Sequence, residues 1–367
     1  MDLGVVTSSH SSSELAELKK ALEVDVKAIV FQQHGGPEVL KYEDAPDPVI
    51  RPNEVLVRVK ACALNHLDIW VRMGLPGVPI PLPHIPGSDV AGEIAQIGAE
   101  VTTVRPGQKV LLAPGVTCGK CAACIAGQDN LCREFTNLGY IINGGCAEFV
   151  RVPEVNCLPY PENLSFEQAA AIPLVFQTAW HMLIARAELQ PGNDVLILGA
   201  GSGVGSAAIQ IAKFFGARVI ATAGNDAKLQ KAKDLGADHV INHKTQKIRE
   251  EVRRITSKRG VDVVFEHVGT ATWEESIASL TPGGRLVTCG ATTGFDAKID
   301  LRFLFTRQLS LLGSYMGAKS ELQTVMKLVA AGKLKPVVDR IFPLAETAAA
   351  HAYLESSSQF GKVVLTV

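Results

Sequence analysis

The chain has 367 residues, a formal net charge of −1, 47% hydrophobic residues and 20% charged residues. This balance is typical of an ordinary globular protein, and it excludes a disordered chain and a strongly basic surface for nucleic acid. At about 150 residues per domain, the length predicts two domains.

Residues 1–25 are predicted to be an N-terminal extension, in which Leu15, Leu18 and Leu22 share one helical face and to which we assign no function. The extension lacks the basic and apolar regions of a secretion signal. No stretch of the chain approaches the roughly 18 consecutive apolar residues of a membrane span. We therefore expect a cytoplasmic protein with neither a membrane nor a nucleic-acid partner.

Short β-type runs separated by Gly and Pro follow in residues 26–160, for example EVLVRVKACAL and DVAGEIAQIG. This spacing predicts a β-rich, barrel-like unit. Within this unit, half of the eight cysteines fall in one stretch with the spacing C-x2-C-x2-C-x7-C: Cys118, Cys121, Cys124 and Cys132. Because a reducing cytoplasm disfavours disulfides, the cluster predicts a metal site.

Four thiolates suit a closed, tetrahedral zinc site, with one structural zinc per chain and no open position for substrate. An iron–sulfur cluster is the rival interpretation, although ferredoxin runs have a short last spacing followed by Pro, and here the spacing is seven residues followed by Arg133. The third interpretation is that the four thiols bind no metal.

A glycine-rich segment, ILGAGSGVGSAAIQIAK, lies between an apolar strand and an apolar helix. Glycines let the backbone turn sharply and approach a pyrophosphate, whose charge then lies at the helix N-terminus. In this context the segment predicts a dinucleotide site rather than a tight turn without a ligand. The residues expected to contact the cofactor are Gly199, Gly201, Ser202, Gly203, Val204, Gly205 and Thr178.

The end of the next strand indicates which dinucleotide binds. An NAD site usually has Asp or Glu there to bond the ribose 2′-hydroxyl, whereas this chain has Ala223. Lys228 and His243 are near enough in sequence to bind a 2′-phosphate, so NADPH is favoured over NADH, although Asp226 weakens the preference.

Six buried strands alternate with helical stretches from about residue 194 to 317, which predicts a doubly wound parallel sheet. The tail returns to strand, helix and strand, and we expect it to complete the first unit. The predicted boundaries are 26–160 with 318–367 for the first domain, about 115–135 for its cysteine lobe, and 161–317 for the cofactor domain.

From residue 27 to the C-terminus, this order of a β-barrel with a four-cysteine lobe, a glycine-loop unit and a return to the barrel resembles the medium-chain dehydrogenase/reductase superfamily. The superfamily includes the zinc alcohol dehydrogenases and the quinone and enoyl reductases. The resemblance implies an α/β chain with a GroES-like β-barrel catalytic domain, a Rossmann cofactor domain and a structural zinc in the lobe.

Alcohol-oxidising members hold a second, catalytic zinc, and this sequence departs at its three ligand positions. CALNHLDIW has Asn65 where the family's Cys would fall, IPGSDVAGEI has Ser88 in place of the His, and AAIPLVFQTAW offers Leu174 or Val175. Because these are poor ligands or none, we expect no catalytic zinc. A rebuilt site remains the alternative, from Cys62, His66, Asp68, His84 and Asp89.

Without a metal to polarise a carbonyl, hydride transfer requires an acceptor that is already activated, such as a conjugated enone, a quinone or an enoyl thioester. The quinone- and enoyl-reductase branches work in this way, and their N-x-x-D stretch is similar to Asn65–Asp68 here. Hydrogen bonds stabilise the developing enolate, and a side chain or water then protonates the α-carbon.

Residues 265–317 are similar to the same stretch of enoyl-thioester reductases, including crotonyl-CoA carboxylase/reductases, with their E-H-x-G step at Glu266 and His267. His267 would then face the nicotinamide and the acceptor, unless it is a hydrogen-bonded imidazole that caps a turn. Carboxylation does not follow from the likeness. The residues predicted to line the reacting centre are Asn65, His66, Asp68, Ser88 and His267.

The sequence therefore predicts an NADPH-dependent reductase of a small conjugated carbonyl compound, either an enoyl-CoA or a quinone. An alcohol dehydrogenase with a rebuilt catalytic zinc and a non-enzymatic NADPH-binding protein are the alternatives. The apolar strand LSLLGSYMG is predicted to lie at a sheet edge, where it would pair with a second copy in a homodimer or homotetramer.

Overall fold

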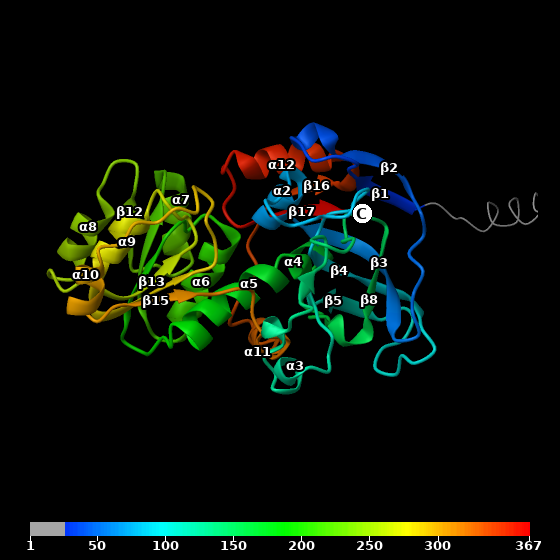
Figure 1. Cartoon of the computed structure of the whole chain (residues 1–367), viewed down its shortest axis with the longest axis horizontal. Coiled ribbons are helices and arrows are strands. Elements are labelled where there is room, and N and C mark those ends of the chain that lie inside the picture. The colour runs from blue at the N-terminus through cyan, green and yellow to red at the C-terminus, as the bar shows by residue number, and fades with distance from the viewer. Residues whose placement is uncertain (1–25) are drawn as a thin grey trace, which may run out of the picture.

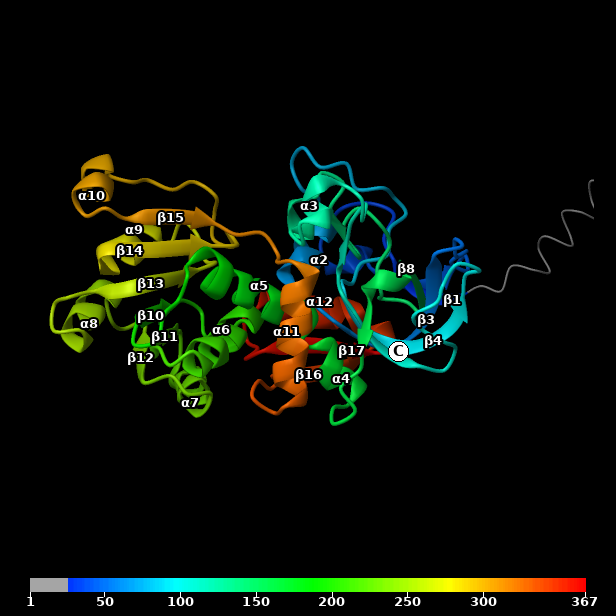
Figure 2. The same cartoon turned by 90° about the horizontal axis from the view of Figure 1, so that it is seen from below.

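The computed structural model describes residues 26–367, so the helical face predicted for Leu15, Leu18 and Leu22 lies outside the described residues. Two β-sheets with their helices lie side by side along the long axis (Figure 1). Helices α5 (Pro173–Trp180) and α11 (Lys319–Ala330) lie between them, as the view turned by 90° also shows (Figure 2). Within residues 26–367 no helix has the length and apolarity that a bilayer crossing requires.

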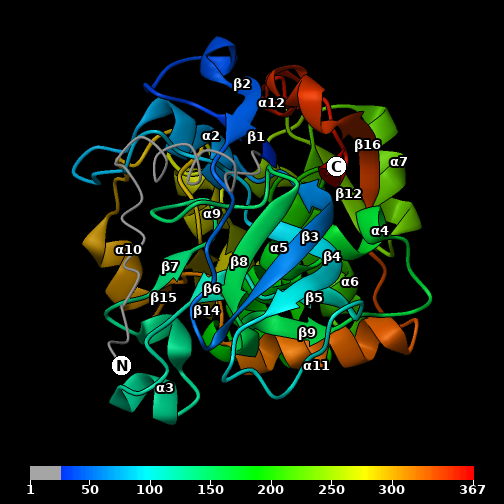
Figure 3. The ribbon, with the colours of Figure 1, turned by 90° about the vertical axis from the view of Figure 1, so that its right-hand side faces the viewer.

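The first sheet has the strand order β16-β17-β3-β4-β5-β9, and β8 pairs with β3 beside that path. Most neighbours are antiparallel, and the sheet curves around its own apolar core (Figure 3). Strand β17 comes from the end of the chain and pairs with β3, so residues 364–366 lie beside residues 61–63. The strands are β3 (Glu54–Ala63), β4 (Asp89–Ile97), β5 (Lys109–Leu112), β8 (Phe149–Pro153), β9 (Cys157–Pro159), β16 (Val338–Pro343) and β17 (Lys362–Thr366).

Smaller elements surround this sheet. Two short antiparallel pairs are formed by β1 (Val26–Val30) with β2 (Lys41–Ala45) and by β6 (Gly115–Val116) with β7 (Thr136–Asn137). The helices on this side are η1 (Pro37–Val39), α2 (His66–Met73), α3 (Ala122–Ile125), η2 (Asp129–Leu131), η3 (Glu154–Asn156), α4 (Phe166–Ala170), η5 (Leu344–Glu346) and α12 (Thr347–Glu355).

The second sheet has six parallel strands in the order β12-β11-β10-β13-β14-β15. Its central strand β10 is buried at every position, as expected when helices cover both faces of a parallel sheet. The strands are β10 (Asp194–Ile197), β11 (Arg218–Ala223), β12 (His239–Asn242), β13 (Val261–Glu266), β14 (Leu280–Thr288) and β15 (Ser310–Gly313). The helices are η4 (His181–Arg186), α6 (Gly203–Phe214), α7 (Asp226–Asp234), α8 (Ile248–Ile255), α9 (Trp273–Ser279) and α10 (Leu301–Thr306).

The strand order reverses between β10 and β13, and dinucleotides bind outside the carboxyl ends of the strands at such a point. The predicted fold class, an α/β chain that joins a β-barrel unit to a doubly wound parallel sheet, is therefore confirmed.

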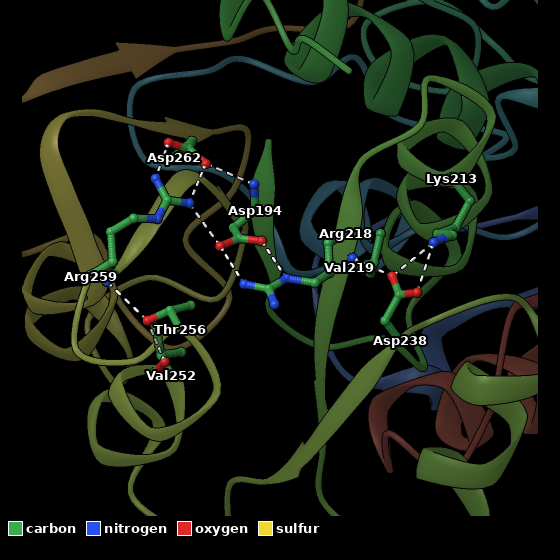
Figure 4. Close-up of polar contacts among 10 residues, drawn as sticks. Asp194, Lys213, Arg218, Val219, Asp238, Val252, Thr256, Arg259 and Asp262 are labelled. Atoms are coloured by element: carbon green, nitrogen blue, oxygen red, sulfur yellow. Dashed lines mark hydrogen bonds and ion pairs between the residues drawn. The ribbon is translucent and has the colours of Figure 1, made fainter. Parts of the chain in front are cut away.

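The amino ends of the parallel strands are joined by charged side chains (Figure 4). Asp194, at the start of β10, is 4% exposed and accepts hydrogen bonds from Arg218 Nε at 2.5 Å and Arg259 Nη2 at 2.7 Å. Arg259 also bonds Asp262 through both terminal nitrogens, at 2.8 Å each. This network fixes the edge of the sheet opposite to the glycine loop, so it supports the fold rather than the site.

Candidate active site

The glycine loop connects β10 to α6 in the predicted manner. Ser202 is the N-cap of α6, and its Oγ accepts a hydrogen bond from Gly205 N at 2.9 Å. Gly199 has φ of +58°, a conformation that favours glycine. A Cβ on Gly203 would lie 2.7 Å from Val175 Cγ1 and 3.0 Å from Lys362 Cδ. The loop therefore presents the free amides of a helix N-terminus and leaves room for Lys362 beside them.

His267 packs directly on this loop. A Cβ on Gly199 would lie 3.0 Å from His267 Cε1, and His267 Nε2 lies 2.9 Å from Leu198 O and 3.2 Å from Ser202 Oγ. Burial is the largest of the causes that act on the imidazole, and it lowers the pKa of His267. The His267 ring is thus hydrogen-bonded to the turn, which is the alternative to an imidazole that faces the nicotinamide and the acceptor.

Glu266, the residue before His267, is fully buried and organises the turn that follows β13. Its carboxylate accepts hydrogen bonds from Val268 N at 2.6 Å, Gly269 N at 3.1 Å and the hydroxyls of Thr272 and Ser276. Its partners are all in its own segment, so its position supports the backbone rather than the reacting centre.

Asn65, Asp89 and Lys362 form a buried network where the two sheets meet. Lys362 Nζ donates to Asn65 Oδ1 at 2.5 Å and to Asp89 Oδ2 at 2.9 Å, and Asn65 Nδ2 donates to the same Asp89 oxygen at 3.0 Å. The second oxygen of Asp89 accepts from Leu174 N at 2.8 Å. Sequence reasoning missed Lys362, although a lysine beside the apolar run VVL of the last strand was a signal that something pairs with its charge.

Two other predicted residues are fully buried and bonded to backbone. Asp68 accepts from Asn65 N at 2.7 Å and from Gly87 N at 2.9 Å, and burial raises its pKa to about 6. Ser88 Oγ donates to Leu138 O at 2.7 Å. Both side chains are 0% exposed, and their place at the reacting centre stays a prediction.

His66 differs from these two because it is partly exposed. It is the first residue of α2, and its ring lies 6.1 Å from that of Trp70, centroid to centroid. Burial lowers the pKa of His66, and the neighbouring His267 lowers it further. The catalytic roles of His66 and of the other predicted residues stay predictions.

The residues of the suggested rebuilt zinc site do not converge. Cys62 Sγ lies 3.8 Å from Cys146 Sγ, His84 Nε2 lies 3.2 Å from Gly139 O, and Asp68 caps α2. Among residues 26–367, one set of three or more Cys, His or acidic ligand atoms lies within 4.8 Å: that of Cys118, Cys121, Cys124 and Cys132.

The geometry of this cysteine set fits zinc. The Sγ–Sγ distances are 3.5 Å for Cys121–Cys124, 3.5 Å for Cys118–Cys132 and 4.0 Å for Cys118–Cys124. A tetrahedral ion with Zn–S bonds of about 2.3 Å separates its ligands by about 3.8 Å. We define residues 118–135, which contain the four cysteines, as the zinc lobe.

Basic side chains lie beyond the carboxyl end of β11, on the β11 side of the glycine loop. A Cβ on Gly224 would lie 3.2 Å from His243 Nε2 and 3.1 Å from Lys244 Cε. Lys228 Nζ donates to Ser357 O at 2.5 Å, so one of its three N–H donors already has an acceptor. Asp226, which weakened the preference for NADPH, accepts from Asn242 Nδ2 at 3.3 Å. Thr178, on α5, is buried with its Oγ1 3.9 Å from Met316 Sδ.

Known proteins share this organisation. Residues 51–162 match the alcohol dehydrogenase GroES-like domain, and residues 203–331 match the zinc-binding dehydrogenase family. The quinone oxidoreductase of Homo sapiens is 30% identical over 93% of this chain and 97% of its own length. The crotonyl-CoA carboxylase/reductase of Cereibacter sphaeroides is 31% identical over 88% of this chain and 83% of its own.

Solved structures agree. A crystal structure described as an NAD-dependent alcohol dehydrogenase superposes with a TM-score of 0.90 at 49% identity, covering 93% of this chain and 99% of the other. The chain therefore belongs to the medium-chain dehydrogenase/reductase superfamily, as an oxidoreductase of the zinc-binding dehydrogenase type that uses a nicotinamide cofactor.

Proposed function

We propose that this protein is an NADPH-dependent reductase of conjugated carbonyl compounds and that its reacting centre holds no metal. The observation that carries the proposal is the closed network of Asn65, Asp89 and Lys362. In this network the side-chain oxygen of Asn65 already accepts a hydrogen bond from Lys362. Asn65 stands at the first of the three positions where alcohol-oxidising members of the family hold their catalytic zinc. The network also takes up the neighbouring carboxylate of Asp89, so a cation there would have to displace a buried ammonium group.

The other two ligand positions support the same conclusion. The Ser88 hydroxyl donates to Leu138 O, and Leu174 has no side-chain ligand atom. Neutral oxygens that are already hydrogen-bonded are poor ligands for zinc.

The bound cofactor would supply the hydride, and the chain's own residues would stabilise the product of its addition. Lys362 has three N–H donors and bonds two acceptors in the network, so its charge and its third N–H would be the groups that stabilise an enolate oxygen in a site sheltered from water. His66 follows Asn65 and is partly exposed, so its imidazole is placed to pass a proton between solvent and the site.

NADPH is the proposed cofactor rather than NADH. Ala223 ends β11 without a carboxylate, Asp226 is bonded to Asn242, and His243 and Lys244 lie over Gly224. Burial lowers the pKa of His243, and the positive charges of Lys244 and Lys228 lower it further. A cluster of this kind attracts a 2′-phosphate.

We further propose a single structural zinc per chain in the zinc lobe and a homodimer formed through β15. This strand pairs with β14 alone among the described strands, and its residues are partly or fully exposed. An edge strand of this kind pairs readily with its copy.

The second function to be weighed is NAD-dependent alcohol oxidation, because the 49%-identical structure carries that description. A panel of reactions separates the two: NADPH with crotonyl-CoA, acrylyl-CoA or benzoquinone, and NAD⁺ with primary and secondary alcohols. We expect NADPH to be consumed with at least one conjugated acceptor and no turnover with alcohols. Alcohol oxidation alone would contradict the proposal, and cofactor binding without any turnover would favour a non-enzymatic role.

A further inference from the structure

Three aromatic residues lie on two segments that border the site, and the proposed reaction assigns none of them a role. The rings of Phe135 and Tyr315 contact edge to face, with centroids 5.6 Å apart and planes at 72°. Tyr140 lies five residues after Phe135, on the same segment. The Tyr315 side chain is 53% exposed, and those of Phe135 and Tyr140 are partly exposed. We define these three residues as the aromatic wall.

The aromatic wall lies on the nicotinamide side of the cofactor site. Tyr315 follows β15 at the carboxyl edge of the parallel sheet, in the half beyond the switch point between β10 and β13. The next residue, Met316, contacts Thr178 on α5. In a doubly wound sheet the two halves of a dinucleotide lie on opposite sides of the switch point, and the basic residues His243 and Lys244 mark the adenosine side here.

The same wall borders the catalytic network. Residues 135–140 run from the Tyr315 contact to the strand that carries Asp89, because Leu138 O accepts the hydroxyl of Ser88, the residue before Asp89. A Cβ on Gly139 would lie 2.4 Å from Gly87 N, so this segment packs tightly against residues 87–89. Tyr140 therefore directly follows a residue that packs against this segment.

The zinc lobe holds both sides of the wall. Phe135 N donates to the carbonyl of Cys132, one of the four cysteines, at 3.0 Å. Tyr315 lies four residues before α11, whose first amide, Lys319 N, is bonded by the lobe's Asp129 Oδ1 at 2.9 Å. The N-cap residue of α11 is Ala318, which cannot cap, so Asp129 supplies this contact from the lobe.

We propose that the zinc lobe builds this aromatic wall as the acceptor-binding face and that the acceptor it selects is a planar quinonoid or aryl-conjugated carbonyl rather than an acyl thioester. The inference rests on the proposed function and names its substrate class. Aromatic rings stack on flat π-systems and gain little from a flexible acyl chain. The structural zinc then has a role in specificity, because it fixes the loop that carries Phe135 and Asp129.

Equilibrium binding tests the inference separately from turnover. Duroquinone, whose substituted ring does not alkylate thiols, is titrated into the full chain with NADP⁺ present, by calorimetry. We expect Tyr315→Ala to raise the duroquinone Kd about tenfold, Tyr315→Phe to bind as the wild type does, and the crotonyl-CoA Kd to change less than about twofold. Tyr42→Ala is the matched control, because Tyr42 is 47% exposed on the distant β2.

Asp129→Asn tests the part played by the zinc lobe, and we expect it to raise the duroquinone Kd severalfold while zinc stays bound. Unchanged duroquinone binding in Tyr315→Ala, equal losses for duroquinone and crotonyl-CoA, or no binding by the wild type would overturn the assignment of the acceptor. Unchanged binding in Asp129→Asn would overturn the role of the lobe. If duroquinone binds through Tyr315 but NADPH is not consumed, the aromatic wall is confirmed as a binding face and the proposed reductase activity is contradicted.

Discussion

Lys362 is the residue on which the account of the site depends most. It is 3% exposed and neutralises the fully buried Asp89, and it bonds Asn65 at the same time. A buried charge without its partner is strongly unfavourable, whereas a pair replaced by neutral groups of similar size is tolerated.

Lys362→Met is therefore expected to lower the free energy of unfolding by about 3 kcal/mol and to reduce kcat with duroquinone or crotonyl-CoA at least tenfold. The double variant Lys362→Met/Asp89→Asn should regain much of the stability but not the activity. Urea unfolding and steady-state kinetics measure the two effects. Lys247→Met, at a lysine side chain that is 76% exposed, is the control and should change neither. Full activity in Lys362→Met would contradict a role in the reaction.

Cofactor choice is also decided by single residues. Lys244→Ala removes a cation that lies over Gly224, so the KM for NADPH should rise about fivefold while the KM for NADH stays unchanged. Lys247→Ala makes the same change of charge three residues away and is expected to have little effect. Equal changes for NADPH and NADH would show that Lys244 does not contact the 2′-phosphate.

Individual residues also show how much of the candidate site could be predicted from the sequence. Asn65 was found because it stands at a known ligand position, and His66 because it is adjacent. Lys362 was missed because its contact with Asn65 spans 297 residues, and no local pattern indicates which side chain a lysine of the last strand will meet. The backbone partners of Asp68 and Ser88 could not be predicted either, because the direction of a side chain at the start of a helix or strand depends on tertiary packing.

At the scale of elements, the parallel sheet has distinct ends, one for function and one for stability. The carboxyl ends carry the glycine loop, His267 and Tyr315, whereas the amino ends carry the Asp194 network (Figure 4). Burial raises the pKa of Asp194, but hydrogen bonds from Arg218 and Arg259 outweigh it, so the pKa in the folded state lies below its usual value.

The sign of this shift predicts how stability depends on pH. Because the folded-state pKa is lowered, the stabilisation is complete above the unfolded-state pKa of about 4 and is lost as the pH falls through the folded-state value. Asp194→Asn should cost about 2 kcal/mol at pH 7, and its difference from the wild type should shrink below pH 4. Urea unfolding from pH 3 to 7 measures this. Asp47→Asn, at an exposed carboxylate, is the control; a difference between Asp194→Asn and the wild type that is constant with pH would contradict the prediction.

The alternation of buried strands with helices was sufficient to predict the doubly wound sheet, because each strand in such a sheet is apolar on both faces. The β-barrel unit was harder to detail, since its sheet joins β3 near the start of the chain to β17 at the end. The boundaries expected at residues 160 and 318 stay predictions.

At the scale of the whole molecule, the zinc lobe links the two sheets. Asp129 bonds the start of α11, and Asn130 Nδ2 lies 3.4 Å from Nε2 of His181, whose Nδ1 lies 2.9 Å from Glu321 on α11. The glycine loop is built separately, from β10 and α6. Loss of zinc should therefore weaken the seam between the sheets without destroying the cofactor site.

Cys121→Ser/Cys124→Ser tests this separation. We expect the variant to lose zinc, to unfold about 5 °C or more below the wild type, and to keep its NADPH Kd within about twofold. Cys62→Ser, at a buried thiol outside the lobe, should keep its zinc. A large loss of NADPH affinity in the lobe variant would show that the cofactor site depends on the metal.

The number of zinc ions per chain tests most directly whether the zinc lobe binds zinc and the reacting centre binds none. Elemental analysis of the purified wild type and of Cys121→Ser/Cys124→Ser gives this number. We predict one zinc in the wild type and none in the variant. Two in the wild type and one in the variant would place a second ion outside the lobe and contradict this prediction.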